Sequence, residues 1–307
     1  MTVTLPRAMR ADLKRARLRE GLASTTPVLT VGAHDALTAK LIENAGFDAV
    51  WVSGLGISTM AFAVPDLNII TMTEALDAAR RIDAATTLPV IADCDNGYGG
   101  FSNVIRTVRD YERAGIAGIS IEDNLFPKRN SLYEGDSRRE LVETAEQARR
   151  LRAAKAAIDP DGLVLIARVE ALIAGHGVEA ACERADAYVD AGADAILIHS
   201  RDKTLGEIEG FLAEWSGVGK VPLVAVPTLY PTFTADDLGA KGFRMVILAN
   251  QPMRAAVKAM EETLQAMADH RNAAVVDPHI ATVDHVFELV GTRETIELED
   301  GIVPEGR

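Results

Sequence analysis

The segment Ala191-Gly192-Ala193-Asp194-Ala195-Ile196-Leu197-Ile198-His199-Ser200 decides the fold class. It passes from an alanine-rich helical pattern through a glycine into a short apolar run that ends in polar residues. The same pattern recurs at 45–53, 114–122 and 241–250. Glycine at this point suits the left-handed residue that ends a helix before the chain turns into a strand. Because all four runs are nearly continuously apolar, both of their faces should be buried, as in a parallel sheet.

Four further apolar runs fill the gaps and are separated by segments rich in Ala, Glu, Arg and Leu, which favour helix; the runs are 28–33, 89–95, 163–170 and 222–228. About eight β/α units in a chain of 307 residues predict one (β/α)₈ TIM-type barrel. The first strand is not followed by a G-x-G-x-x-G motif, which agrees with a barrel rather than a doubly wound sheet. We therefore predict a single barrel domain over residues 1–307.

Both ends of the chain carry additional segments. Residues 1–26 are basic and lack the apolar core of a secretory signal, and Leu13, Leu18 and Leu22 predict a helix that caps the barrel. An amphipathic transit peptide is the alternative for this region. We assign residues 251–307 to terminal helices, with a long helix over 252–271. The apolar residues of 276–291 need a surface to cover them, and a neighbouring subunit is one candidate.

The composition excludes several classes of function. A net charge of −13 argues against a nucleic-acid partner or an anionic membrane surface. It does not exclude a small anionic substrate, because the few charges that line a pocket set its local field. No apolar run approaches the roughly 20 residues that span a bilayer. Only two cysteines are present, Cys94 and Cys182, so we expect no disulfide framework and a cytoplasmic location.

The functional residues of such barrels lie at the carboxyl ends of the strands. Asp93 and Asp95 are two residues apart, so on an extended strand they point to the same side, and Glu122 ends the next strand. Three carboxylates in one volume repel each other unless a cation lies among them. Oxygen ligands of this kind favour Mg²⁺, with Mn²⁺ as an alternative. A competing interpretation is that Asp95 opens a turn and caps the following helix.

Two basic side chains and a loop complete the predicted site. Arg168 ends an apolar strand, and a buried arginine should face either a structural carboxylate or an anionic ligand. His199 either contacts a ligand or is held in place by a hydrogen bond. The loop after Glu122 carries Lys128, Asn130 and Ser131 and predicts a lid. This loop has no cysteine or histidine between 124 and 131, which argues against thiol acid–base chemistry.

Taken together, these motifs resemble the phosphoenolpyruvate mutase and phosphonopyruvate hydrolase branch of the isocitrate lyase superfamily. The resemblance runs from about residue 31 to beyond residue 250 and is carried by Ser53-Gly54-Leu55, Asp66, Asp93-x-Asp95-x-Gly97-Tyr98-Gly99, Glu122-Asp123, Phe126-Pro127-Lys128-x-Asn130-Ser131, Ala167-Arg168-Val169-Glu170 and His199-Ser200. It implies a (β/α)₈ barrel whose final helix is exchanged between two subunits. It also implies a homotetramer built as a dimer of helix-swapped dimers, with residues 251–307 at the subunit interface.

The resemblance implies Mg²⁺ held at Asp93, Asp95 and Glu122, partly through water. It implies a mutase that interconverts phosphoenolpyruvate and phosphonopyruvate, the P–C bond-forming step of phosphonate biosynthesis. The implied substrate-binding residues are Ser53, Gly54 and Leu55 for the carboxylate and enolate oxygens. The implied phosphoryl-binding residues are Arg168, His199, Asn130 and Ser131, with charge from Lys128. Asp66 would orient these groups or act as a transient nucleophile.

The lid distinguishes the branches of this superfamily. Carbon–carbon lyases carry a Lys-x-Cys-Gly-His type of loop, whereas Lys128-Arg129-Asn130-Ser131 resembles the mutase, and the hydrolase typically has threonine in place of Asn130. Asn124 departs from both, which usually have lysine there, and the loop from Ser53 to Asp66 is one residue longer than usual. The segments after His199 and around Thr228 resemble the hydrolase equally well. The leading expectation is a mutase. The alternatives are a phosphonopyruvate hydrolase, a Mg-dependent carbon–carbon lyase or decarboxylase on a 2-oxo or 2-hydroxy acid, and a non-catalytic barrel that acts as an assembly or binding protein.

Overall fold

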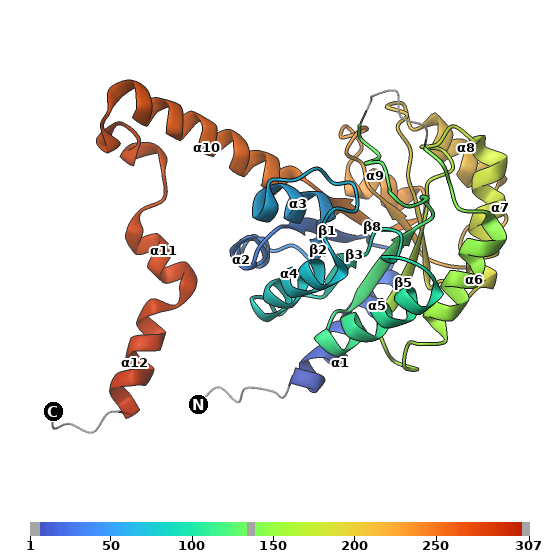
Figure 1. The fold of residues 1–307 in the computed structure, drawn as a ribbon, viewed down its shortest axis with the longest axis horizontal. Coiled ribbons are helices and arrows are strands. Elements are labelled where there is room, and N and C mark those ends of the chain that lie inside the picture. Colours follow the sequence, from blue (N-terminus) through green and yellow to red (C-terminus); the bar gives the residue numbers. More distant parts are fainter. Residues whose placement is uncertain (1–6, 134–138, 303–307) are drawn as a thin grey trace. The chain divides into compact units, whose positions relative to one another are not determined.

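Eight parallel strands form a closed barrel in the computed structural model, which describes residues 7–133 and 139–302. Each strand pairs with the next one along the chain, and the last pairs with the first (Figure 1). The strands are β1 (Val28–Ala33), β2 (Ala49–Val52), β3 (Val90–Asp93), β4 (Gly118–Glu122), β5 (Val164–Val169), β6 (Ala195–Ile198), β7 (Leu223–Ala225) and β8 (Phe243–Leu248). The predicted (β/α)₈ TIM-type barrel is therefore confirmed.

Helix α1 precedes the first strand, and the other helices of the first 250 residues follow strands and surround the barrel (Figure 1). These helices are α1 (Arg7–Ala23), α2 (Ala36–Asn44), α3 (Gly54–Phe62), α4 (Met72–Ala84), α5 (Phe101–Ala114), α6 (Thr144–Lys155), α7 (Gly177–Asp190), α8 (Gly206–Glu214) and α9 (Ala235–Ala240). The glycines predicted to end helices have φ values of 83° at Gly46, 93° at Gly115, 96° at Gly192 and 105° at Gly242. All four lie in the left-handed region, where a side chain would be strained. This confirms the repeated helix–glycine–strand pattern that predicted the barrel.

Helix α1 closes the amino-terminal end of the barrel. Leu18 and Leu22 belong to the cluster of apolar side chains that fills the barrel interior. A Cβ added at Gly118, the first residue of β4, would lie 3.3 Å from the Leu18 side chain, which places α1 at the start of the strands. The predicted capping helix is present, but the inward placement of Leu13 was wrong, because this side chain is 56% exposed. Leu13 precedes Leu18 by five residues and so lies about 140° away around the helix.

The chain divides into two compact units, Met1–Gln251 and Pro252–Arg307, and each is described by itself. The second unit contains most of α10 (Gln251–His270), then η1 (Ala273–Val275), η2 (Asp277–His279), α11 (Val283–Val290) and α12 (Thr292–Ile302). The predicted long helix over 252–271 is thus present. Several large apolar side chains of this unit are exposed, including Leu264, Phe287 and Leu298. Their burial in a subunit interface stays a prediction. Among the described helices, none combines the length and apolar character that a membrane crossing requires.

Candidate active site

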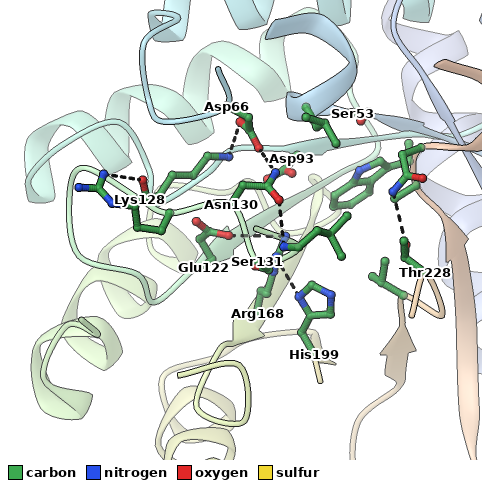
Figure 2. Close-up of a pocket in the computed structure, with 17 residues that line it drawn as sticks. Ser53, Asp66, Asp93, Glu122, Lys128, Asn130, Ser131, Arg168, His199 and Thr228 are labelled. Atoms are coloured by element: carbon green, nitrogen blue, oxygen red, sulfur yellow. Dashed lines mark hydrogen bonds and ion pairs between the residues drawn. The ribbon is translucent and has the colours of Figure 1, made fainter. Parts of the chain in front are cut away.

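A cavity of about 60 Å³ lies at the carboxyl ends of the strands (Figure 2). Because α1 covers the other end of the barrel, this end is free to carry a site. The wall includes ten of the twelve predicted site residues, namely Ser53, Leu55, Asp66, Asp93, Glu122, Lys128, Asn130, Ser131, Arg168 and His199. Gly54 and Asp95 are outside the wall. The structure therefore brings together side chains that are up to 146 positions apart in the sequence, since 199 − 53 = 146.

Asp95 lies behind the cavity wall because β3 ends at Asp93 and Asp95 has a left-handed φ of 48°. Its carboxylate accepts a hydrogen bond of 2.9 Å from Asn68 Nδ2 and is paired with the Lys128 ammonium. The alternative interpretation, a turn, is present, because the Gly97 amide donates to the Cys94 carbonyl at 2.8 Å. Asp95 does not cap the next helix, since α5 starts after Gly100 and has no side-chain cap.

Lys128 provides a cation among the acidic side chains. It is 4% exposed, and its Nζ lies 2.8 Å from Asp66 Oδ1 in addition to its pairing with Asp95 (Figure 2). Burial alone would lower the pKa of this ammonium, but the carboxylates of Asp95 and Asp66 raise it well above its usual value. Lys128 is thus charged, and it offsets the repulsion that the clustered carboxylates would otherwise create.

Arg168 faces both a structural carboxylate and the cavity, so it combines the two roles considered from the sequence. Its Nε is hydrogen-bonded to Glu170, and its Nη2 donates to Ser131 Oγ at 2.8 Å. Its Nη1 lies 3.5 Å from Glu122 Oε2. Burial acts to lower the pKa of Arg168, but Glu170 and Glu122 raise it above its ordinary value. Ser131 Oγ in turn donates to Glu170 Oε2 at 2.8 Å, which connects the loop after Glu122 to the end of β5.

His199 is a buried neutral group beside this arginine. Its Nδ1 lies 3.0 Å from both Glu170 Oε1 and Arg168 Nη2. Burial lowers the pKa of His199, and this outweighs the opposing effect of Glu170. The pKa of Glu170 is well below its usual range because Arg168 and His199 more than offset its burial. At neutral pH the site thus presents a charged guanidinium and an uncharged imidazole to the cavity.

The amino terminus of α3 supplies backbone donors to the same region. Ser53 caps this helix, because its Oγ accepts a hydrogen bond of 3.0 Å from the Gly56 amide. The first amides of a helix have no intrahelical partner, and they favour an anion nearby. A Cβ added at Gly54 would lie 3.5 Å from Asp93 Oδ2 and 3.5 Å from Asp95 Oδ1, so the helix begins directly against these carboxylates.

The carboxylates of the wall fit a hydrated Mg²⁺ better than an ion held by protein alone. Glu122 is 3% exposed, and its buried Oε1 has no hydrogen-bond partner among the described residues. Burial raises the pKa of Glu122 to about 8, although Arg168 acts against this. In residues 7–133 and 139–302, no three Asp, Glu, His or Cys side chains are placed to hold a metal ion together. Mg²⁺ usually keeps several waters and binds through one or two carboxylates, which Asp93 and Glu122 offer.

We use the term lid for residues 124–133, which cover the cavity. The lid is pinned at its base by an antiparallel bridge between Asn124 and Leu141, and the Leu125 amide donates to the Glu140 carbonyl at 2.9 Å. Asn124, the residue that departs from the usual lysine, is 2% exposed and lies outside the cavity wall. At the lid tip, Asn130 Nδ2 donates to Asp66 Oδ2 at 2.7 Å. The departure therefore affects the lid base and not the groups that face the cavity.

Asp123 does not line the cavity, but its hydrogen bonds hold the elements that carry the cavity residues. Its buried carboxylate accepts hydrogen bonds from the Glu170 amide at 2.9 Å, from Arg184 Nη1 at 2.9 Å and from the Tyr188 hydroxyl at 2.7 Å. These contacts join the end of β4 to β5 and α7. Asp123 thereby fixes the backbone that carries Glu170, the partner of Arg168 and His199.

Sequence reasoning did not select several residues of the site. Trp51, Arg129, Leu132, Val226 and Ala249 also line the cavity. Trp51 could have been found, because strand alternation points it to the same side as Ala49, into the barrel. Asn68 and Arg139 support the lid from loops, where no periodic signal exists. Arg139 Nη2 donates to the carbonyls of Asn130 at 3.1 Å and Ser131 at 3.4 Å.

Fold and site together define a (β/α)₈ barrel whose carboxyl-end cavity combines carboxylates, a guanidinium and a lid, at the end where barrel enzymes carry their active sites. The sequence model of the family described as phosphoenolpyruvate phosphomutase matches residues 18–268. The chain belongs to this family, within the phosphoenolpyruvate mutase/isocitrate lyase superfamily.

Three comparisons illustrate how similar the chain is to known members. It is 40% identical over 281 residues to a phosphoenolpyruvate phosphomutase from Tetrahymena pyriformis, covering 92% of each chain. It is 44% identical over 279 residues to a phosphonopyruvate hydrolase from Variovorax sp. (strain Pal2), covering 91% of this chain and 95% of the relative. A crystal structure of a phosphonopyruvate hydrolase in complex with oxalate and Mg²⁺ matches with a TM-score of 0.86 and 42% identity, covering 94% and 98% of the two chains. The chain is thus about equally similar in sequence to a mutase and to a hydrolase, and these identities do not distinguish the two activities.

Proposed function

We propose that the protein is a Mg²⁺-dependent phosphoenolpyruvate mutase that interconverts phosphoenolpyruvate and phosphonopyruvate. The observation that carries this proposal is the closed lid, with the Asn130 amide bonded to Asp66 and the Lys128 ammonium paired with Asp66 and Asp95. Asn130 is the position at which the hydrolase branch typically has threonine. A lid fixed to the cavity wall at two points supports a reaction that must keep water from the phosphoryl group.

The substrate would bind with its two ends at opposite parts of the cavity. The free amides at the start of α3, at Gly54 and Leu55, would hold the carboxylate and enolate oxygens of the pyruvyl part. Arg168 and His199 would hold the phosphoryl oxygens, with Ser131 and Asn130 closing over them from the lid. The guanidinium is held in orientation by Glu170 and Ser131, so little reorganisation is needed when the anion binds.

The reaction breaks the P–O bond of phosphoenolpyruvate and forms a P–C bond to C3 of the resulting pyruvate enolate. No proton or water is gained or lost overall. Phosphoryl transfer has a loose transition state, so catalysis depends on positioning and on charge stabilisation. Both oxygens of Asp66 are engaged, Oδ1 in an ion pair with Lys128 and Oδ2 in a hydrogen bond from Asn130, which supports the orienting role for this carboxylate over the nucleophilic one.

Mg²⁺, when bound, would stabilise the negative charge that develops on the enolate oxygen. Asp93 and Glu122 would hold it, with Asp95 behind them and water completing the shell. The magnesium in the related phosphonopyruvate hydrolase structure supports this choice of metal, and Mn²⁺ remains the alternative. Lys128 would share the task of balancing the acidic charge when the lid is closed.

The second candidate is a phosphonopyruvate hydrolase, which the identity of 44% to the Variovorax relative favours. It would use the same carboxylates and Arg168 but admit a water to the phosphoryl group. A carbon–carbon lyase is supported less, because the lid has no cysteine to move a proton.

We also propose that the protein is a homotetramer in which the terminal helices are exchanged between subunits. The exposed apolar side chains of residues 252–302 support this, since unpartnered apolar surface of this kind favours association. Light scattering of the purified protein at micromolar concentration should give four times the chain mass of 32.9 kDa; a monomeric mass would refute the proposal.

Incubation with Mg²⁺ and phosphonopyruvate, followed by ³¹P NMR, tests the proposed function. The appearance of phosphoenolpyruvate supports the mutase. Inorganic phosphate as the only product would establish the hydrolase instead. No reaction with phosphonopyruvate, with cleavage of a 2-hydroxy acid, would indicate a lyase.

A further inference from the structure

Asn68 connects two parts of the site, the turn after β3 and the lid. Its Nδ2 donates to Asp95 Oδ2 at 2.9 Å, and its Oδ1 accepts a hydrogen bond of 2.7 Å from the Lys128 backbone amide. The same Oδ1 is 3.3 Å from Asn96 Nδ2. The Asn68 side chain therefore bridges the turn after β3 and the backbone of the lid, at the residue whose ammonium pairs with Asp66 and Asp95.

The chemistry of this bridge requires a neutral amide. The position needs a donor toward the Asp95 carboxylate and an acceptor toward the Lys128 amide, and asparagine supplies both. An aspartate of the same shape would lose the donor and place a further negative charge against Asp95. Asn68 also has a left-handed φ of 59°, a conformation that asparagine tolerates better than most residues.

We propose that Asn68 is a positioning residue that latches the lid in its closed state, and this inference rests on the proposed function only for its catalytic consequence. The latch acts on the lid backbone, whereas Asn130 and Ser131 act through their side chains. By fixing the Lys128 amide, Asn68 sets the point from which the Lys128 side chain reaches Asp66 and Asp95. Its contact with Asp95 makes the closed lid and the acidic turn a single hydrogen-bonded unit.

The latch can be tested on the ligand-free protein by limited trypsin digestion. Cleavage after Lys128 requires the lid to open, because Lys128 is 4% exposed. Asn68→Gly removes the side chain without straining the left-handed backbone. We expect it to speed this cleavage by about 30- to 2000-fold, as the loss of one charge-assisted and one neutral hydrogen bond implies. Asn68→Asp, which keeps the side-chain size, should speed it at least as much.

Asn103→Ala is the matched control, because Asn103 lines the same surface pocket as Asn68 and, among the described residues, makes no side-chain hydrogen bond to the lid. Cleavage after Arg106, on α5, reports global unfolding. Equal cleavage of the lid in the wild type, Asn68→Gly and Asn68→Asp would overturn the proposal. A parallel rise at Arg106 would overturn it too, because the residue would then be merely structural.

The catalytic consequence is measured separately by ³¹P NMR. With phosphonopyruvate and Mg²⁺, Asn68→Gly should yield more inorganic phosphate per phosphoenolpyruvate than the wild type, because an open lid admits water. An unchanged product ratio alongside faster lid cleavage would overturn the catalytic role of the latch. If the wild type forms no phosphoenolpyruvate, the proposed function fails, whereas the digestion result still decides whether Asn68 holds the lid.

Discussion

Replacing Asn130 by threonine should change how the enzyme partitions the phosphoryl group. In the structure, Asn130 Nδ2 donates to Asp66 Oδ2 at 2.7 Å, and Asn130 Oδ1 accepts from the Leu132 amide at 2.9 Å. Threonine carries its hydroxyl one bond closer to the backbone and cannot make both contacts. The first bond involves a carboxylate whose side chain is 8% exposed, and such bonds contribute about 1.5 to 3 kcal/mol, against about 0.5 to 1.5 kcal/mol for the second.

Losing both contacts should therefore cost the closed lid about 2 to 4.5 kcal/mol, a shift of about 30- to 2000-fold toward the open state. The assay is ³¹P NMR of initial product formation from phosphonopyruvate with Mg²⁺. We expect Asn130→Thr to form phosphoenolpyruvate more slowly and to release inorganic phosphate. Tyr133→Phe, an exposed change on the same lid, serves as the control and should leave both rates unchanged. Full mutase rate without phosphate release in Asn130→Thr would refute the role assigned to Asn130.

Three further predictions follow from the contacts around the site. Arg168→Lys keeps the charge but loses the planar guanidinium that contacts Glu170, Ser131 and Glu122, so kcat/KM should fall by at least about 100-fold. The surface variant Arg106→Lys should leave kcat/KM unchanged. Asp123→Asn leaves the buried Arg184 charge poorly paired and should lower the free energy of unfolding by about 3 to 5 kcal/mol in urea titrations. Asp110→Asn, in an exposed pair, should lower it by less than about 1 kcal/mol. Equal losses in the two variants would contradict the anchoring role of Asp123. Burial lowers the pKa of His199 below its ordinary 6.5, so between these two pKa values the unfolded chain binds more protons than the folded chain does. The free energy of unfolding should therefore fall as the pH drops from about 6.5 toward the pKa of the folded state. His199→Gln should reduce that slope in urea midpoints measured between pH 7 and 5, and an unchanged slope would show that another group is responsible.

The sequence predicted the barrel well because its signals are local and repeated. Each helix–glycine–strand unit carries its own left-handed cap, as at Gly115 and Gly192, and most side chains of each strand are apolar and buried. Parallel strands then bring their carboxyl ends to one edge, so the convergence of Asp93, Glu122 and Arg168 follows from topology. Leu13 was placed wrongly because a spacing of five residues does not return to the same helix face.

The details of the site depend on conformations that no periodic pattern encodes. Strand alternation placed Asp93 and Asp95 on one side, and both carboxylates do lie 3.5 Å from the same Cβ position at Gly54, but the strand ends at Asp93 and Asp95 does not line the cavity. The cation at Asp95 is the Lys128 ammonium, delivered by a lid from 33 positions later. Asn68 acts from an irregular loop through hydrogen bonds alone. Such contacts require three-dimensional structure, because side-chain reach and loop geometry decide them.

The most direct test of the central claim is the initial ratio of phosphoenolpyruvate to inorganic phosphate that the wild-type protein forms from phosphonopyruvate with Mg²⁺. A lid anchored at Asp66, Asp95 and Glu170 should keep water from the phosphoryl group, so phosphoenolpyruvate should form first and in excess. Inorganic phosphate forming from the start, without phosphoenolpyruvate, would contradict the claim and establish that this lid admits water.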